Sequence, residues 1–205
     1  PAMRKYGNMF RAFDCPGDAA MNRIRIADLR MYCGNTAIHA DMITWHSDES
    51  VEVAALQLAN IMFGVPQLSV RLQDCREDEL NMIRFYTQYW NQHANILMEG
   101  DFRPSRPLAN YPIQKVVKDN FTIVGVHDDF VVSLDVVTEN VHFLNAQLAK
   151  EIVIKSSDDF GSFNGIVFDC QGNRVSEREI ELSKGAIVIE VPPCGMVQLK
   201  QQKNS

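Results

Sequence analysis

The sequence lacks an excess of basic residues: 20 Lys and Arg stand against 26 Asp and Glu, a formal net charge of -6. A chain with no basic surplus to neutralise phosphates is a poor candidate for binding nucleic acid. The sequence also lacks an apolar run long enough to cross a bilayer, and a recognisable signal peptide. We therefore expect no nucleic-acid partner and no membrane partner. A cytoplasmic and a periplasmic location stay equally open.

Patterns of cysteine and glycine that bind metals or cofactors are missing as well. The five Cys residues include no CxxC pair and no Cys/His spacing suited to zinc, so we expect mostly buried free thiols, at positions 15, 33, 75, 170 and 194. The 11 Gly residues form no dinucleotide-binding or phosphate-binding motif. His39, Asp41 and His46 are suitable ligand types for a metal, but their spacing is generic, so a polar cluster is favoured. The sequence predicts no metal and no other cofactor.

What the sequence does contain is enough apolar residues, 46%, for a sizeable core. In the first half, strand and helix patterns alternate. Short apolar runs predict strands at 9–13, 36–44 and 65–72, and helical periodicity predicts helices at 18–33, 51–63 and 76–98. Strands separated by single helices imply a parallel sheet with right-handed crossovers.

Three such βα units cannot close a barrel by themselves. An open parallel sheet of three strands would leave two unpaired edges and an uncovered apolar face. We therefore expect either further strands before Pro1 or a second subunit.

Residues 105–205 have a different pattern. The Pro-rich stretch 102–112 predicts a linker or a connection that packs back on the fold, and no helical period follows it. Short β-branched and aromatic runs separated by turn residues predict an antiparallel β-sandwich, with strands at 121–126, 130–137, 141–144, 151–155, 165–169, 186–191 and 196–199. Residues 113–205 contain no Trp, so we expect the sandwich to be structural, to pack on the helix 76–98 and to lack a sugar site.

Asp14 is the leading candidate for chemistry. It stands where an apolar run ends and a helical pattern is about to begin, which is where a (β/α) barrel carries its catalytic groups. The alternative is that Asp14 turns the chain or caps the helix, although Asp18 is better placed as the cap. Arg11 lies near enough along the strand to bind a sugar hydroxyl or to pair with the carboxylate.

A second polar group follows the second predicted strand. His39 and Asp41, with Trp45 and His46, bracket the end of that strand. An aromatic ring for stacking, with polar groups for hydroxyls, is typical of a sugar subsite. The alternative is a polar cluster whose members satisfy one another's hydrogen bonds at a strand end.

Three segments resemble a known family in the correct order. These are the run from Met3 to Asp14 followed by Cys-Pro-Gly-Asp, the run from Gly34 to Ser47, and Gly100-Asp101-Phe102-Arg103. They resemble the C-terminal part of the catalytic barrel of α-galactosidases of glycoside hydrolase family thirty-six, the melibiase type, and its junction with a C-terminal β-sandwich. The resemblance covers essentially the whole chain. It implies that residues 1–104 are the C-terminal part of a (β/α)8 TIM barrel and that residues 105–205 are the β-sandwich.

The resemblance implies a retaining exo-α-galactosidase acting on galactoside oligosaccharides, and a possible homo-oligomer in the full-length enzyme. It implies that Asp14 is the acid/base, with Asp18 as second choice because the family pattern is offset by about one residue here. Arg11, Cys15, Trp45 and His46 would bind substrate. The nucleophile belongs to an earlier strand, so the fragment alone would be inactive. An α-galactosyl transferase of the raffinose-synthase type and a non-catalytic carbohydrate-binding or structural module stay open as alternatives.

Overall fold

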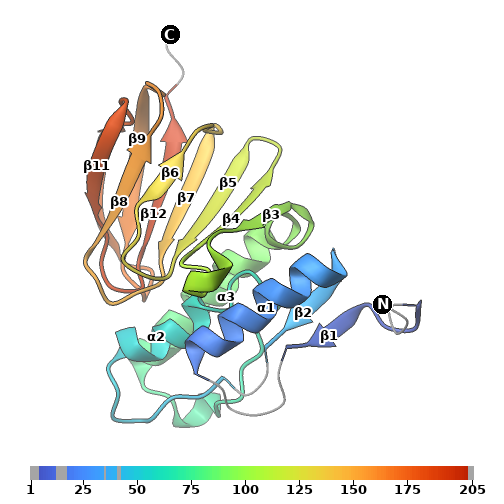
Figure 1. Cartoon of the computed structure of the whole chain (residues 1–205). Helices are drawn as coiled ribbons and strands as arrows, with labels where there is room; N and C mark the ends of the chain where they lie inside the picture. Colours follow the sequence, from blue (N-terminus) through green and yellow to red (C-terminus); the bar gives the residue numbers. More distant parts are fainter. Residues whose placement is uncertain (1–4, 13–17, 35, 41–42, 203–205) are drawn as a thin grey trace.

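The structure, a computed structural model, describes residues 5–12, 18–34, 36–40 and 43–202. Figure 1 shows helices gathered below a body of strands. The first 100 residues supply β1 (Met9–Arg11), α1 (Ala19–Cys33), β2 (Ala37–His39), α2 (Val51–Ala59), the 3-10 turn η2 (Leu72–Asp74) and α3 (Glu77–Glu99). No helix in these described ranges is long and apolar enough to span a membrane.

The prediction that the first half is part of a TIM barrel is wrong. Among the described residues, strand residues outnumber helical ones, 35% against 28%, and they form several sheets with only three α-helices. β1 and β2 form a parallel sheet of only two strands, each three residues long. Among the described residues, the predicted strand at 65–72 makes only the isolated bridges His39–Val65 and Ile43–Leu68 before η2 begins. Pro66 contributes to this outcome because it has no N–H to give to a strand ladder.

The second half forms two facing sheets, as a sandwich requires. The larger sheet has seven strands in the order β10-β9-β12-β7-β5-β4-β3, and the smaller has three in the order β11-β8-β6. Their bounds are β3 Asp101–Pro104, β4 Ile113–Lys118, β5 Phe121–Val126, β6 Val132–Leu134, β7 Asn140–Asn145, β8 Glu151–Ser156, β9 Ser162–Phe168, β10 Arg174–Glu181, β11 Gly185–Glu190 and β12 Met196–Gln201. The sandwich is not purely antiparallel, because β5 pairs with β7, and β6 with β8, in parallel.

The predicted linker at 102–112 is partly wrong. β3 lies at its start and pairs with β4, from Asp101 opposite Val117 to Pro104 opposite Gln114. A proline is tolerated here because β3 is an edge strand of the sheet, where one row of N–H groups needs no partner. The 3-10 turn η3 (Pro107–Ala109) follows.

Helix α3 joins the two halves. At its start the Glu79 carboxylate accepts a hydrogen bond from Arg76 N at 2.8 Å, and the Cys194 carbonyl of the sandwich accepts a hydrogen bond from Tyr86 Oη at 2.5 Å. At Gly100, where α3 ends, an added Cβ would lie 2.5 Å from the Ile96 carbonyl oxygen and from Val116 Cγ2. The close approach of helix to sheet therefore requires glycine there. The expectation that the sandwich packs on helix 76–98 is confirmed.

Helix α1 is tied to the same sheet through buried arginines. Arg30 donates to the Phe63 carbonyl at 2.5 Å, and its guanidinium lies 4.1 Å from the ring centre of Phe102 on β3. Arg23 donates to Asn60 Oδ1 at 2.6 Å and to the Asn110 carbonyl. Burial lowers the pKa of Arg30 to about 10, so it stays protonated at neutral pH. Each buried charge is thus bonded to carbonyl or amide oxygens or lies over a ring.

A cluster of aromatic and imidazole rings fills the contact between α3 and the sheet. Tyr89 Oη lies 3.0 Å from His142 Nδ1, and Phe121 packs edge-on against His142 with ring centres 4.6 Å apart. His93 lies 5.3 Å from the His142 ring centre. Burial, and secondarily the charge of His93, lowers the pKa of His142 to about 3, and burial also lowers the pKa of His93.

This cluster predicts loss of stability in acid. His142 titrates near pH 6.5 when unfolded and near 3 when folded. Between these values the unfolded chain binds more protons, so the free energy of unfolding falls as pH is lowered. For one such group the slope is at most about 1.4 kcal/mol per pH unit. His142→Gln, which keeps a hydrogen-bonding partner for Tyr89, should flatten the pH dependence of the urea midpoint between about pH 6 and 4. Identical pH profiles for the two proteins would contradict this account.

Candidate functional site

The candidate site lies at one edge formed by parallel segments. Ala12 N donates to the His39 carbonyl at 2.7 Å, Val65 N donates to the Ile38 carbonyl at 2.7 Å, and Ile43 bridges Leu68 in parallel. The chain therefore runs in the same direction in three neighbouring segments. Their carboxyl ends lie at a common edge, which carries the loops that follow β1 and β2.

Of the two candidates for the acid/base, only one lies within the described residues. Asp14 and Cys15 lie outside the described residues, as does Asp41. Asp18 is described, and its Oδ1 accepts a hydrogen bond from Met21 N at 2.7 Å as the N-cap of α1. The expectation that Asp18 caps this helix is confirmed. A carboxylate engaged in this way stabilises the helix start by about 1 kcal/mol relative to alanine.

Of the predicted substrate-binding residues that the structure describes, two are exposed and one is half-buried. Arg11 is exposed at the end of β1, directly opposite His39, whose Nδ1 lies 3.0 Å from the Ala40 carbonyl oxygen. Trp45 is half-buried in the loop after β2, and its Nε1 donates to Glu79 Oε1 at 2.7 Å. His46 is exposed, and its backbone N donates to the Glu49 carboxylate at 3.1 Å. No group of three His, Cys, Asp or Glu suited to a metal occurs in the described ranges.

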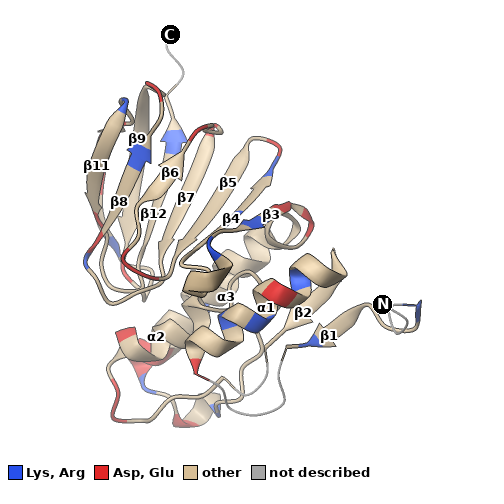
Figure 2. Ribbon diagram, in the orientation of Figure 1, with Lys and Arg blue, Asp and Glu red and all other residues tan. Residues whose placement is uncertain are grey.

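A recess of about 210 Å³ opens beside Trp45. Its walls come from the loop after β2 and from the stretch that leads into α3, and its lining residues are Thr44, Trp45, Ser47, Val70, Arg71, Asp74, Cys75 and Glu79. Figure 2 shows Asp and Glu residues along the loop into α2 and at the short helical turn beside it. The recess thus combines an aromatic ring with polar groups.

Glu79 organises this recess and was missed from the sequence. Its carboxylate is buried and accepts from Trp45 Nε1 and from Arg76 N, at 2.7 and 2.8 Å. Arg76 also lies 3.1 Å from the same carboxylate and donates to the carbonyls of Ser47 and Glu49. A Glu three residues after a helix start is a position from which the side chain can accept from the first N–H of the helix, but nothing in the sequence signals its bond to Trp45.

Cys75 is not a nucleophile in this arrangement. Its Sγ donates to the Arg71 carbonyl at 3.4 Å, and burial, with the nearby charges of Glu79 and Asp74, raises the pKa of the thiol. A protonated thiol is a weak nucleophile. Cys33, Cys75, Cys170 and Cys194 are all free, but only Cys170 and Cys194 are buried, so the expectation of mostly buried thiols holds for half of the described ones.

Comparison of the sequence with protein-family models and with curated proteins found no match.

The bond from Trp45 to Glu79 can be tested against a matched control. Trp45→Phe keeps an aromatic ring but removes a donor from a buried carboxylate, and should cost about 1.5–3 kcal/mol. Trp90→Phe also removes one hydrogen bond, from Nε1 to the Gly64 carbonyl at 2.7 Å. Because that acceptor is neutral, the expected cost is smaller, about 0.5–1.5 kcal/mol. Urea unfolding measures both variants. A larger loss for Trp90→Phe than for Trp45→Phe would show that Glu79 does not depend on Trp45.

Proposed function

We propose that this chain is part of a retaining exo-α-galactosidase that hydrolyses terminal α-galactosides such as melibiose and raffinose-type oligosaccharides. The observation that carries the proposal is the common edge of the parallel segments, where the chain leading to Asp14 lies beside the chain leading to Trp45. The resemblance of three ordered sequence segments to such enzymes supports the same reading.

Asp14 is the acid/base in this proposal. The cap bond of Asp18 to Met21 N favours Asp14, because a carboxylate committed to a helix start is less able to transfer a proton. A retaining mechanism also needs a second carboxylate, the nucleophile, which the resemblance assigns to an earlier strand of the enzyme. The two would lie about 5 Å apart, as a retaining mechanism requires.

Trp45 provides the apolar face for the sugar. The hydrogen bond from its Nε1 to Glu79 holds the ring in one orientation, and a fixed ring loses little freedom when a sugar packs against it. Arg11, Cys15 and His46 would supply polar contacts to the sugar hydroxyls. Arg11 and His46 are exposed, which suits groups that meet a substrate.

The test is Asp14→Asn in the full-length protein that contains this chain. An acid/base carboxyl protonates the departing glycosidic oxygen, a contribution of roughly 10²–10⁴-fold. The variant should lose about that much kcat/KM on melibiose, and far less on an aryl α-galactoside whose phenolate leaves without protonation. Initial rates on the two substrates give the comparison.

Asp18→Asn is the matched control. Asparagine caps helices about as well as aspartate, so this variant should keep both activities and nearly full stability. Equal losses on both substrates for Asp14→Asn would remove Asp14 from the acid/base role. A selective loss for Asp18→Asn instead would assign the role to Asp18. Galactosyl transfer to an added sugar in place of hydrolysis would identify the transferase alternative.

A further inference from the structure

The inner face of the seven-stranded sheet is only partly covered. In the register of β9 and β10, Ser176 lies opposite Val167 and Arg178 opposite Gly165, so both share a face with the buried Val167. That face packs against the three-stranded sheet. Ile180, further along β10 on the same face, is buried there, but Arg178 is exposed. The smaller sheet therefore stops short of the first half of β10.

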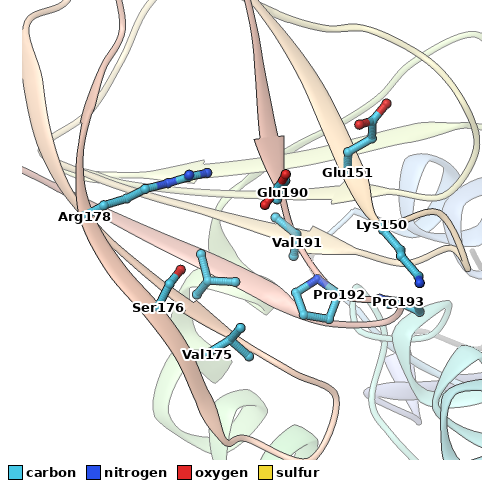
Figure 3. A pocket seen from close by; sticks show the side chains of 10 residues that line it. Lys150, Glu151, Val175, Ser176, Arg178, Glu190, Val191, Pro192 and Pro193 are labelled. Atoms are coloured by element: carbon cyan, nitrogen blue, oxygen red, sulfur yellow. The ribbon is translucent and has the colours of Figure 1, made fainter.

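A groove of about 500 Å³ occupies the uncovered part. Figure 3 shows Val175, Ser176 and Arg178 of β10 on one side of it, and Glu190 and Val191 at the end of β11 on the other. Lys150 and Glu151, where β8 begins, lie beyond β11. The ten lining residues include no aromatic ring, so the groove lacks a stacking surface for a sugar.

β11 presents an open strand edge to this groove. Within the described residues β11 pairs only with β8. Val191 N donates to the Lys150 carbonyl, and in an antiparallel ladder successive residues direct their peptide groups to opposite sides. The peptide groups of Ala186, Val188 and Glu190 therefore face away from β8. They offer N–H donors and C=O acceptors to one more strand.

This edge lacks the usual protection against strand pairing. β10, the edge of the larger sheet, carries Arg174, Glu177, Arg178 and Glu179 and has a register shift near Val175. Charges and bulges of this kind discourage edge pairing. β11 reads Gly-Ala-Ile-Val-Ile-Glu over six residues, with six regular pairs to β8 and an exposed Val188. An unprotected edge beside a groove is suited to strand addition.

We propose that an extended acidic peptide binds in this groove as a fourth strand on the open edge of β11, with a carboxylate facing Arg178. Alternate side chains of such a strand would point inward, over Ser176 and Arg178. Arg178 takes part in no ion pair within the described ranges, so a carboxylate there gains an unshared partner. Glu190 and Glu151 lie directly opposite each other in the ladder and also line the groove, so they disfavour acidic side chains at the positions of the peptide that face them.

A second copy of this chain does not fit the same place. A two-fold pairing of β11 with another β11 would set a second seven-stranded sheet beside the first. A groove of about 500 Å³ is far too small to hold such a sheet. The groove has room for one strand and not for a sandwich, and this favours a single extended segment as the occupant.

The probe is a fluorescein-labelled hexapeptide of alternating Thr and Glu, titrated with the whole chain and followed by fluorescence anisotropy. The matched probe has Lys in place of Glu. We expect saturable binding of the Glu peptide and about tenfold or weaker affinity for the Lys peptide, because the facing charge is then repulsive. Arg178→Glu should reverse this preference, which a non-specific effect on folding would not do.

Val188→Pro tests the strand edge separately. The Val188 N–H faces away from β8, so proline there removes an edge donor without taking a hydrogen bond from the β8–β11 ladder. Affinity for the Glu peptide should fall about tenfold or more, while far-UV circular dichroism and the melting temperature show that the sandwich is intact. No saturable binding of the Glu peptide at millimolar concentration, or equal affinity for the Glu peptide in wild type and Arg178→Glu, would overturn the proposal. Concentration-dependent dimerisation abolished by Val188→Pro would replace the peptide with a second copy.

Discussion

The packing of α3 against the seven-stranded sheet is the contact on which the other features depend. Its buried face supplies Met82, Tyr86 and Tyr89 to one apolar cluster that includes Val116 and Met196 of the sandwich. A cluster that draws on both halves makes each half part of the other's core. The small β1–β2 sheet, with three residues in each strand, has little to stabilise it apart from such packing.

The same helix also orders the candidate site. Glu79, near its first residue, receives Trp45, and Arg76 just before it binds the carbonyls of Ser47 and Glu49. Two turns further along, Tyr86 bonds to Cys194 in the sandwich. The loop after β2 is therefore anchored to the sandwich through one rigid element. In the proposed enzyme the sandwich would therefore have a structural function and need no sugar site of its own. It holds α3 in place through Tyr86, and α3 in turn orients the Trp45 ring through Glu79.

Sequence patterns predicted some elements well for identifiable reasons. β8 and β11 alternate Ile152, Ile154, Ile187 and Ile189 into the core, so their period was visible. The highly charged β10 is an exposed edge strand, and its sequence gave no strand signal. The barrel was predicted because short apolar runs alternated with helices, but periodicity does not report strand length or closure. At the site, Asp18 was predictable as a cap. The role of Glu79 was not, because it depends on a loop 34 residues away.

The central claim is that α3 makes both halves one cooperative unit, and equilibrium unfolding in urea tests it most directly. Both Trp residues, 45 and 90, precede the sandwich, so their fluorescence reports on the first half. Far-UV circular dichroism at about 215 nm reports mainly on the strands, which lie mostly in the second half. If the halves share one core, the two probes give one transition with the same midpoint and slope. A fluorescence transition that is complete before the circular dichroism signal changes would show two independent units and contradict the account.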